Sequence, residues 1–133
     1  MNNSKPFLAI FLMALTMLAA PALAQEEDFA LLSRIIKTGN AKDLVQQFSR
    51  TVELNIDGRE ASYSKAQAEA VLKDFFSKSP PQMFAINHQG ASKSGSPYAI
   101  GEYKNALGKY RVWIRLKQVN GRNLVYEMSF IKE

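Results

Sequence analysis

The spacing of apolar residues changes near Pro81 and keeps its new period to the end of the chain. Before this point, most apolar residues recur every three to four positions, as in amphipathic helices, and after it they alternate with polar residues, as in half-buried strands. The first part therefore begins with two predicted helices, separated by Gly39 and by Asn40 as the cap of the second. The apolar positions that share a face in these helices are Phe29, Leu32, Ile35 and Ile36, then Leu44, Val45 and Phe48.

A strand pair and a third helix are predicted next. Residues 52–56 alternate, and the turn signal Asp57-Gly58 lets a brief strand over 61–63 pair back. Residues 64–67 have the pattern of a capping box, followed by a helix with one apolar stripe. This helix is expected to end at residues 79–81, Ser-Pro-Pro, because proline has no backbone N–H to donate.

Four strands joined by short turns are predicted for the rest of the chain, over about 83–92, 97–106, 109–119 and 123–132. Asn120-Gly121 is the strongest hairpin signal, since a type I′ turn needs positive φ at both central residues. Helices followed by hairpin-linked strands predict an α+β fold, in which a curved antiparallel sheet packs on N-terminal helices.

The alternation also predicts which side chains of the last two strands face the helices. These are Tyr110, Val112, Ile114 and Leu116 in the first, and Leu124, Tyr126, Met128 and Phe130 in the second. The opposite phase is then expected to face water or a partner.

Residues 1–24 have the pattern of a cleavable secretory signal peptide. Lys5 precedes an almost wholly apolar run over 7–20, and Ala22-Leu23-Ala24 is a cleavage signal. The run is shorter than the roughly 20 residues of a spanning helix, and no later segment approaches that length. We therefore expect an exported protein, periplasmic or extracellular, that is cleaved near Ala24. Residues 25–133 would remain as a single domain without a transmembrane segment.

Composition excludes several classes of function. The chain has no cysteine and one histidine, so disulfides and thiolate zinc sites are excluded, and neither a metal nor a cofactor is expected. It contains no G-x-S-x-G nucleophile elbow and no glycine-rich phosphate loop. The net charge is +5, of which Lys5 contributes one. This mild excess falls short of a nucleic-acid signature, and we expect no nucleic-acid partner.

The chain resembles a known family over nearly its whole length. The segments that carry the resemblance are Gly39–Leu44, Tyr63–Glu69, Leu72–Phe76, His88–Gly90, Tyr98–Gly101 and Gly108–Val112. Together with the signal peptide, they are similar to the exported bacterial domain-of-unknown-function family 4783 of the nuclear-transport-factor-2-like (cystatin-like) superfamily. The resemblance implies a cone-shaped fold, shared with ketosteroid isomerase. It implies no activity, because the family has no assigned reaction, ligand or catalytic residue.

Four residues are candidates for binding a ligand inside such a cone. His88 is in phase with Phe84 and Ile86, so it is expected to point toward the helices, as a base or polar anchor or simply bonded to backbone. Glu102 would lie inside if its own phase is buried and in solvent if the opposite phase is buried. The full set is Tyr63, His88, Glu102 and Tyr126.

A carboxylate base beside a tyrosine oxyanion donor is what a ketosteroid-isomerase-type enzyme requires. Glu102 with Tyr126 or Tyr63 is the pair that this alternative needs, acting on a small apolar ligand. No spacing in the sequence demands it, and no catalytic residue is assigned.

The outward phase of the strand over 109–119 is basic around the chain's one tryptophan. Two partners fit this face. A second copy of the chain would cover an apolar patch on the outer sheet face, and an anionic envelope component would be held by arginines. The other alternative is a solvated face. The candidate interface residues are Arg111, Trp113, Arg115, Val125 and Ile131. The sequence thus favours an exported, non-enzymatic binding or interaction domain, with a homodimer as the first hypothesis and the isomerase-type enzyme as the alternative.

Overall fold

The computed structural model describes residues 24–133. A helix covers residues 24–38, and the predicted signal peptide lies outside the described part except for Ala24. The elements that follow are α2 (Ala41–Val45), β1 (Phe48–Ile56), β2 (Arg59–Ser64), α3 (Lys65–Lys78), β3 (Met83–Ala91), β4 (Pro97–Asn105), β5 (Gly108–Val119) and β6 (Arg122–Lys132). Within the described range, no helix has the length and apolar character needed to cross a membrane.

The local signals in the sequence form the expected elements. The Asn40 side chain accepts a hydrogen bond from the backbone N–H of Asp43 at 3.0 Å, which caps α2. Ser64 and Gln67 form the predicted capping box at the start of α3, each side chain bonding the other residue's backbone N–H. Phe48 differs from expectation: it begins β1 instead of extending α2, although it is fully buried as predicted.

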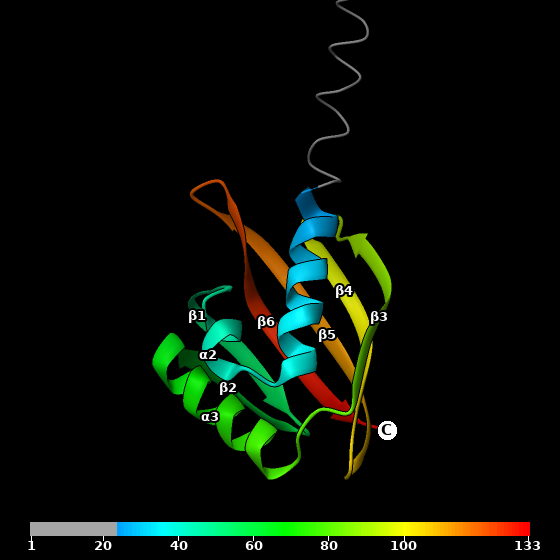
Figure 1. The fold of residues 1–133 in the computed structure, drawn as a ribbon. Coiled ribbons are helices and arrows are strands. Elements are labelled where there is room, and N and C mark those ends of the chain that lie inside the picture. Colours follow the sequence, from blue (N-terminus) through cyan, green and yellow to red (C-terminus); the bar gives the residue numbers. More distant parts are fainter. Residues whose placement is uncertain (1–23) are drawn as a thin grey trace, which may run out of the picture.

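The six strands form one sheet in the order β2-β1-β6-β5-β4-β3. All neighbours are antiparallel except β1 and β6, which run parallel. The helix over residues 24–38 lies in the hollow of this curved sheet, and α3 lies against the β1–β2 hairpin (Figure 1). The fold is therefore the predicted α+β arrangement of helices on a curved sheet.

Aromatic rings fill the space between α3 and the sheet. Phe75 lies 5.1 Å from Phe130 and 5.7 Å from Tyr110, measured between ring centroids. Tyr103 lies 5.3 Å from Phe130, edge to face. Each such pair stabilises the fold by about 0.5–1.5 kcal/mol beyond the burial of its surface. The centre of the cone is thus packed with side chains.

Two β-bulges reverse the predicted phase of side chains. In β3, Ile86 pairs with Gly101 and His88 with Ile100, so Asn87 is an extra residue. In β6, Tyr126 is the extra residue, because its neighbours pair with consecutive residues of β5. Side chains alternate strictly in a regular strand, and one inserted residue moves those beyond it to the other face. Val125 is consequently fully buried, whereas His88 is exposed.

Candidate functional site

The outer face of the sheet, turned away from the helices, has Trp113 near its centre. Trp113 pairs with Ile100 of β4 on one side and with Ser129 of β6 on the other. Ile100 in turn pairs with His88 of β3. The next row across the same strands contains Glu127, Arg115, Tyr98 and Gly90. We call this surface, from β2 to β3, the outer face.

On the β3–β4 side of Trp113, aromatic side chains and the Arg115 guanidinium group surround a hollow of about 180 Å³. The Tyr98 hydroxyl lies 3.1 Å from Nε2 of His88, at hydrogen-bond distance. Arg115 and Tyr126 complete this part of the lining. Because aromatic faces and a guanidinium group both favour partly buried, polar-rimmed contacts, the hollow has the composition of an interface.

On the β1–β2 side of Trp113, a second hollow of about 250 Å³ is acidic. The carboxylates of Glu53, Glu60 and Glu127 line it. The Ser62 hydroxyl donates to Glu53, which fixes one of these carboxylates. The outer face therefore has glutamates toward β1 and β2 and an arginine in the hollow on its other side, with Trp113 lining both hollows.

The basic residues of β5 make loose ion pairs on this face. Arg115 Nε lies 3.6 Å from Glu127 Oε2, and Lys109 Nζ lies 3.5 Å from Glu102 Oε1. All four side chains are about one-third to more than one-half exposed. Exposed pairs of this kind contribute about 0–1 kcal/mol each, so a partner can replace them at little cost.

The structure does not bring the four candidate ligand residues together. His88 and Tyr126 line the hollow beside Trp113, although both were predicted to face the helices, and the bulges explain the difference. Glu102 lies on the outer face beside Lys109, because Ala99, Gly101 and Tyr103 occupy the buried phase of β4. Tyr63 packs against the core under α3.

Four of the five candidate interface residues lie on the outer face. Arg111, Trp113, Arg115 and Ile131 do so, whereas the placement of Val125 there was wrong, since the β6 bulge turns it into the core. Tyr98 and Ile100 also lie on the outer face and were not named. Both share the phase of β4 that contains Glu102. The alternative in which that phase faces solvent would have placed them on the outer face.

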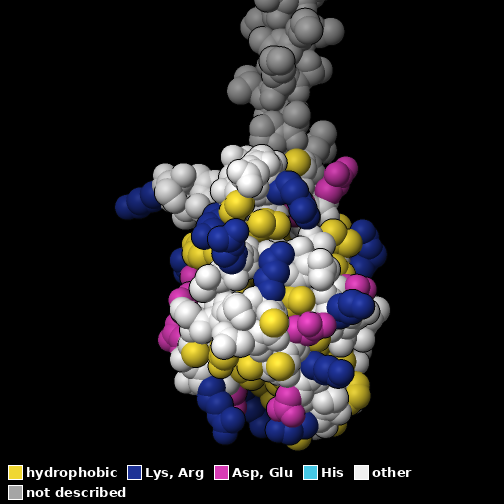
Figure 2. All heavy atoms as spheres, turned by 90° about the vertical axis from the view of Figure 1, so that its left-hand side faces the viewer, with side chains coloured by type: hydrophobic (Ala, Val, Ile, Leu, Met, Phe, Trp, Pro, Cys, Tyr) yellow, Lys and Arg dark blue, Asp and Glu magenta, His cyan; other side chains and the backbone are white. Residues whose placement is uncertain are grey.

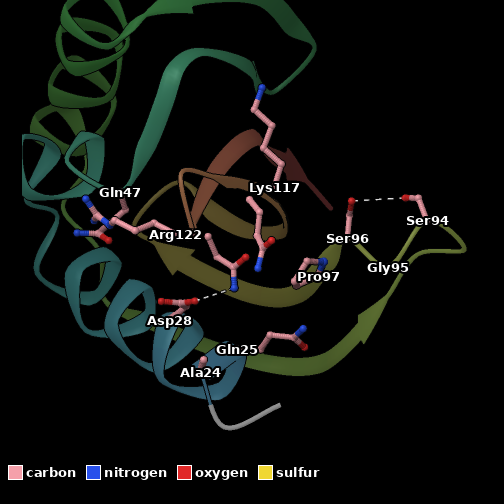
Figure 3. A pocket seen from close by; sticks show the side chains of 13 residues that line it. Ala24, Gln25, Asp28, Gln47, Ser94, Gly95, Ser96, Pro97, Lys117 and Arg122 are labelled. Atoms are coloured by element: carbon pink, nitrogen blue, oxygen red, sulfur yellow. Dashed lines mark hydrogen bonds between the residues drawn. The ribbon is translucent and has the colours of Figure 1, made fainter. Parts of the chain in front are cut away.

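A third hollow, of about 580 Å³, lies between the helix over residues 24–38, the β3–β4 loop and the β5–β6 hairpin. Side-chain amides of Gln25, Gln47 and Asn123 line it, and the Asn123 amide donates to Asp28 Oδ2 at 3.1 Å (Figure 3). Among the described residues that line this hollow, Asp28 is the only carboxylate, and it is already hydrogen-bonded. This hollow therefore offers polar contacts without a carboxylate pair for acid–base chemistry.

No cluster of three or more potential metal ligands occurs among residues 24–133. Burial raises the pKa of the Tyr103 hydroxyl to about 12, while the Asn105 side chain beside it partly opposes this effect. Tyr103 therefore remains protonated at neutral pH.

Solved structures resemble this chain over most of its length. A DUF4783 family protein from Bacteroides fragilis YCH46 is 28% identical, covers 76% of this chain and 94% of its own, and superposes with a TM-score of 0.71. One from Bacteroides ovatus ATCC 8483 is also 28% identical, with coverages of 77% and 92% and a TM-score of 0.71. An NTF-2 like protein of unknown function from Silicibacter pomeroyi DSS-3, 12% identical, covers 84% of this chain and 95% of its own with a TM-score of 0.61.

The last of these similarities shows the fold alone, which is nuclear-transport-factor-2-like as the sequence predicted. No curated protein matches the chain. A family model described as "Domain of unknown function (DUF4783)" matches residues 29–130. The chain therefore belongs to the DUF4783 family.

Proposed function

We propose that this protein is a non-catalytic interaction domain that associates with a second copy of itself through the outer face. The observation that carries the proposal is the charge separation around Trp113, with arginines and lysines along β5 and glutamates toward β1 and β2. A two-fold symmetric interface uses the same surface on both copies. Such a surface must be self-complementary, and one with opposite charges on its two halves satisfies this condition.

The apolar centre of the outer face supports the same proposal. Trp113 and Ile100 are half-buried, and Ile131 is 37% exposed. Aromatic residues and arginine are enriched at protein interfaces relative to the rest of the surface. Covering these side chains with a second copy removes apolar surface from water, at about 25 cal/mol per Å².

The position of Glu102 argues against the isomerase-type alternative. An acid–base site of that type needs a carboxylate inside the cone, beside a tyrosine hydroxyl. Glu102 instead lies beside Lys109 on the outer face, and aromatic rings occupy the space between α3 and the sheet. Export remains part of the proposal, and the residue pattern of the N-terminal segment supports it.

Analytical ultracentrifugation tests the association directly. The protein isolated from cells that express the full chain should sediment as a dimer, and Trp113→Ala or Ile131→Glu should shift it toward monomer by at least about tenfold in Kd. Leu107→Glu is the matched control, since Leu107 is an exposed apolar residue outside the outer face. A wild-type monomer at high concentration, or a Trp113→Ala dimer of unchanged Kd, would refute the proposal.

A further inference from the structure

An apolar groove lies beside α3, away from the outer face. It has a volume of about 670 Å³ and runs between α3, the β1–β2 hairpin and the β4–β5 turn. Apolar side chains gather low on the α3 side of the molecule, among charges of both signs (Figure 2). We call this surface the α3 groove; its apolar lining consists of Leu54, Ile56, Tyr63, Ala70, Val71, Phe75, Leu107 and Tyr110.

The lining of the α3 groove is held in place by the core. Phe75 is only partly buried, yet its ring contacts Phe130 at 5.1 Å and Tyr110 at 5.7 Å between centroids. Close packing holds such a side chain in one rotamer. The groove is therefore largely preformed, and its volume lies in the range of about 300–1,000 Å³ that small-molecule sites occupy.

Leu107 adds exposed apolar surface at the edge of the groove. It is 59% exposed, more than any other large apolar side chain in the described part of the chain. It lies in the β4–β5 turn, a position that polar residues and glycine usually occupy. An exposed leucine next to an apolar groove is the arrangement expected at a binding surface.

The charged residues at the edge of the groove are two carboxylates and two cations, and among them Arg59 is the group that can hold an anion. Lys78 Nζ lies 2.9 Å from Asp74 Oδ2, so these two charges neutralise each other. Asp57 Oδ1 accepts a hydrogen bond from the backbone N–H of Lys132. Arg59 lines the groove too, and no ion pair among residues 24–133 includes it. Its guanidinium group can hold a carboxylate through two parallel hydrogen bonds.

We infer that the α3 groove binds an amphipathic small molecule, with an acyl-like apolar chain over Phe75 and Leu107 and a carboxylate at Arg59. The apolar chain of the ligand would remove the partly exposed side chains from water. Its carboxylate would supply the opposite charge that pairs with the Arg59 guanidinium group. Neither contact uses the outer face. The inference is therefore independent of self-association.

Isothermal titration calorimetry with dodecanoate, below its micelle concentration, tests this site on the protein isolated from cells that express the full chain. Dodecyltrimethylammonium is the matched probe, with the same chain and the opposite head charge. We expect saturable binding of dodecanoate and a Kd at least about tenfold weaker for the cation. Arg59→Gln should weaken dodecanoate binding and should not weaken binding of the cation.

Leu107→Glu places a carboxylate at the edge of the groove and should weaken dodecanoate binding by at least about tenfold. Because Leu107 is exposed, this variant should fold, which circular dichroism verifies. Ile131→Glu, the variant that disrupts the proposed dimer, is the control and should bind dodecanoate as the wild type does. Absence of saturable binding, or binding that neither Leu107→Glu nor Arg59→Gln changes, would overturn the inference without affecting the dimer proposal.

Discussion

The ring of Tyr98 lies over Gly90 across the β3–β4 strand pair. A Cβ atom added at Gly90 would lie 2.8 Å from the Tyr98 hydroxyl oxygen, closer than real side chains approach. Glycine in an edge strand is often covered by an aromatic ring from its neighbour in this way. The contact positions the Tyr98 hydroxyl at 3.1 Å from His88 Nε2, so the glycine supports one side of the outer face.

Gly90→Ala should displace the Tyr98 ring and break its hydrogen bond with His88. Because the clash is with the outer end of the half-buried Tyr98 side chain, which can turn away, the free energy of unfolding should fall by no more than about 1 kcal/mol, the low end of the cost of overpacking. Urea denaturation measures this loss, and the chemical shifts of the His88 imidazole report the hydrogen bond. Gln89→Ala, an exposed change in the same strand, is the control. A Gly90→Ala protein with the stability and His88 shifts of the wild type would contradict this packing.

The alternation of apolar and polar residues predicted where the strands lie. It did not predict, for every strand, which side chains face the core. In β5, which has no extra residue, Tyr110 and Val112 are buried as predicted. In β3 and β6, Asn87 and Tyr126 are extra residues opposite regular partners. A bulge is defined by the register of two strands, so the sequence around one residue carries little signal for it. His88, Val125 and Tyr126 were misplaced for this reason.

The two phases of β4 could not be separated from sequence, for a different reason. Both contain apolar residues: Ile100 on the outer face, and Ala99 and Tyr103 in the core. The choice depends on Gly101, where an added Cβ would lie 2.9 Å from the Phe84 ring. Only the tertiary contact with Phe84 shows that this phase is the buried one. The α3 groove was missed likewise, because it needs three distant segments to meet.

Tyr103→Phe should remove part of the loss of stability at alkaline pH. Burial favours the protonated phenol and raises its pKa from 10.0 to about 12 in the folded protein. The stability of the folded protein is therefore unaffected by this ionisation below pH 10. It falls as the pH rises toward 12, because the unfolded chain then loses the Tyr103 proton more readily than the folded protein does. Two pKa units correspond to about 3 kcal/mol at most. Chemical denaturation of both proteins between pH 8 and about pH 12 measures the difference.

At pH 7 the same variant should be at least as stable as the wild type. The Tyr103 hydroxyl is buried, and although the Asn105 side chain lies beside it, no described residue makes a hydrogen bond of good geometry with it. Burying a polar group without a partner costs about 1–3 kcal/mol, and phenylalanine avoids this cost. A clear loss of stability at pH 7, or identical alkaline profiles for the two proteins, would show that this hydroxyl makes a contact that the packing does not indicate.

Ser64→Ala should weaken the start of α3. The Ser64 hydroxyl accepts a hydrogen bond from the backbone N–H of Gln67, and the Gln67 side chain accepts from the Ser64 N–H. Losing a serine cap typically costs about 1 kcal/mol. Thermal denaturation measures this change. Ser77→Ala, at the other end of the helix, is the control and should have a smaller effect, because its exposed hydroxyl only donates to the Asp74 carbonyl. Equal stability losses for the two variants would contradict a specific role for the cap.

Charge reversal on the outer face should weaken self-association from either side. Arg115→Glu places a negative charge in the basic half, and Glu53→Lys places a positive charge in the acidic half. If the halves of two copies meet, each single change juxtaposes like charges and should raise the dimer Kd by about tenfold or more. The double variant restores opposite signs and should recover part of this loss.

Sedimentation at two salt concentrations separates this effect from a general loss of folding. Raising the ionic strength from about 0.1 M to 1 M shortens the Debye length from about 10 Å to 3 Å, so the penalty of each single reversal should shrink. Lys73→Glu, an exposed charge reversal on α3, is the control and should leave the Kd unchanged. If Arg115→Glu and Glu53→Lys each dimerise as tightly as the wild type at low salt, charge complementarity does not hold the two copies together. The apolar centre around Trp113 would then have to account for the whole association.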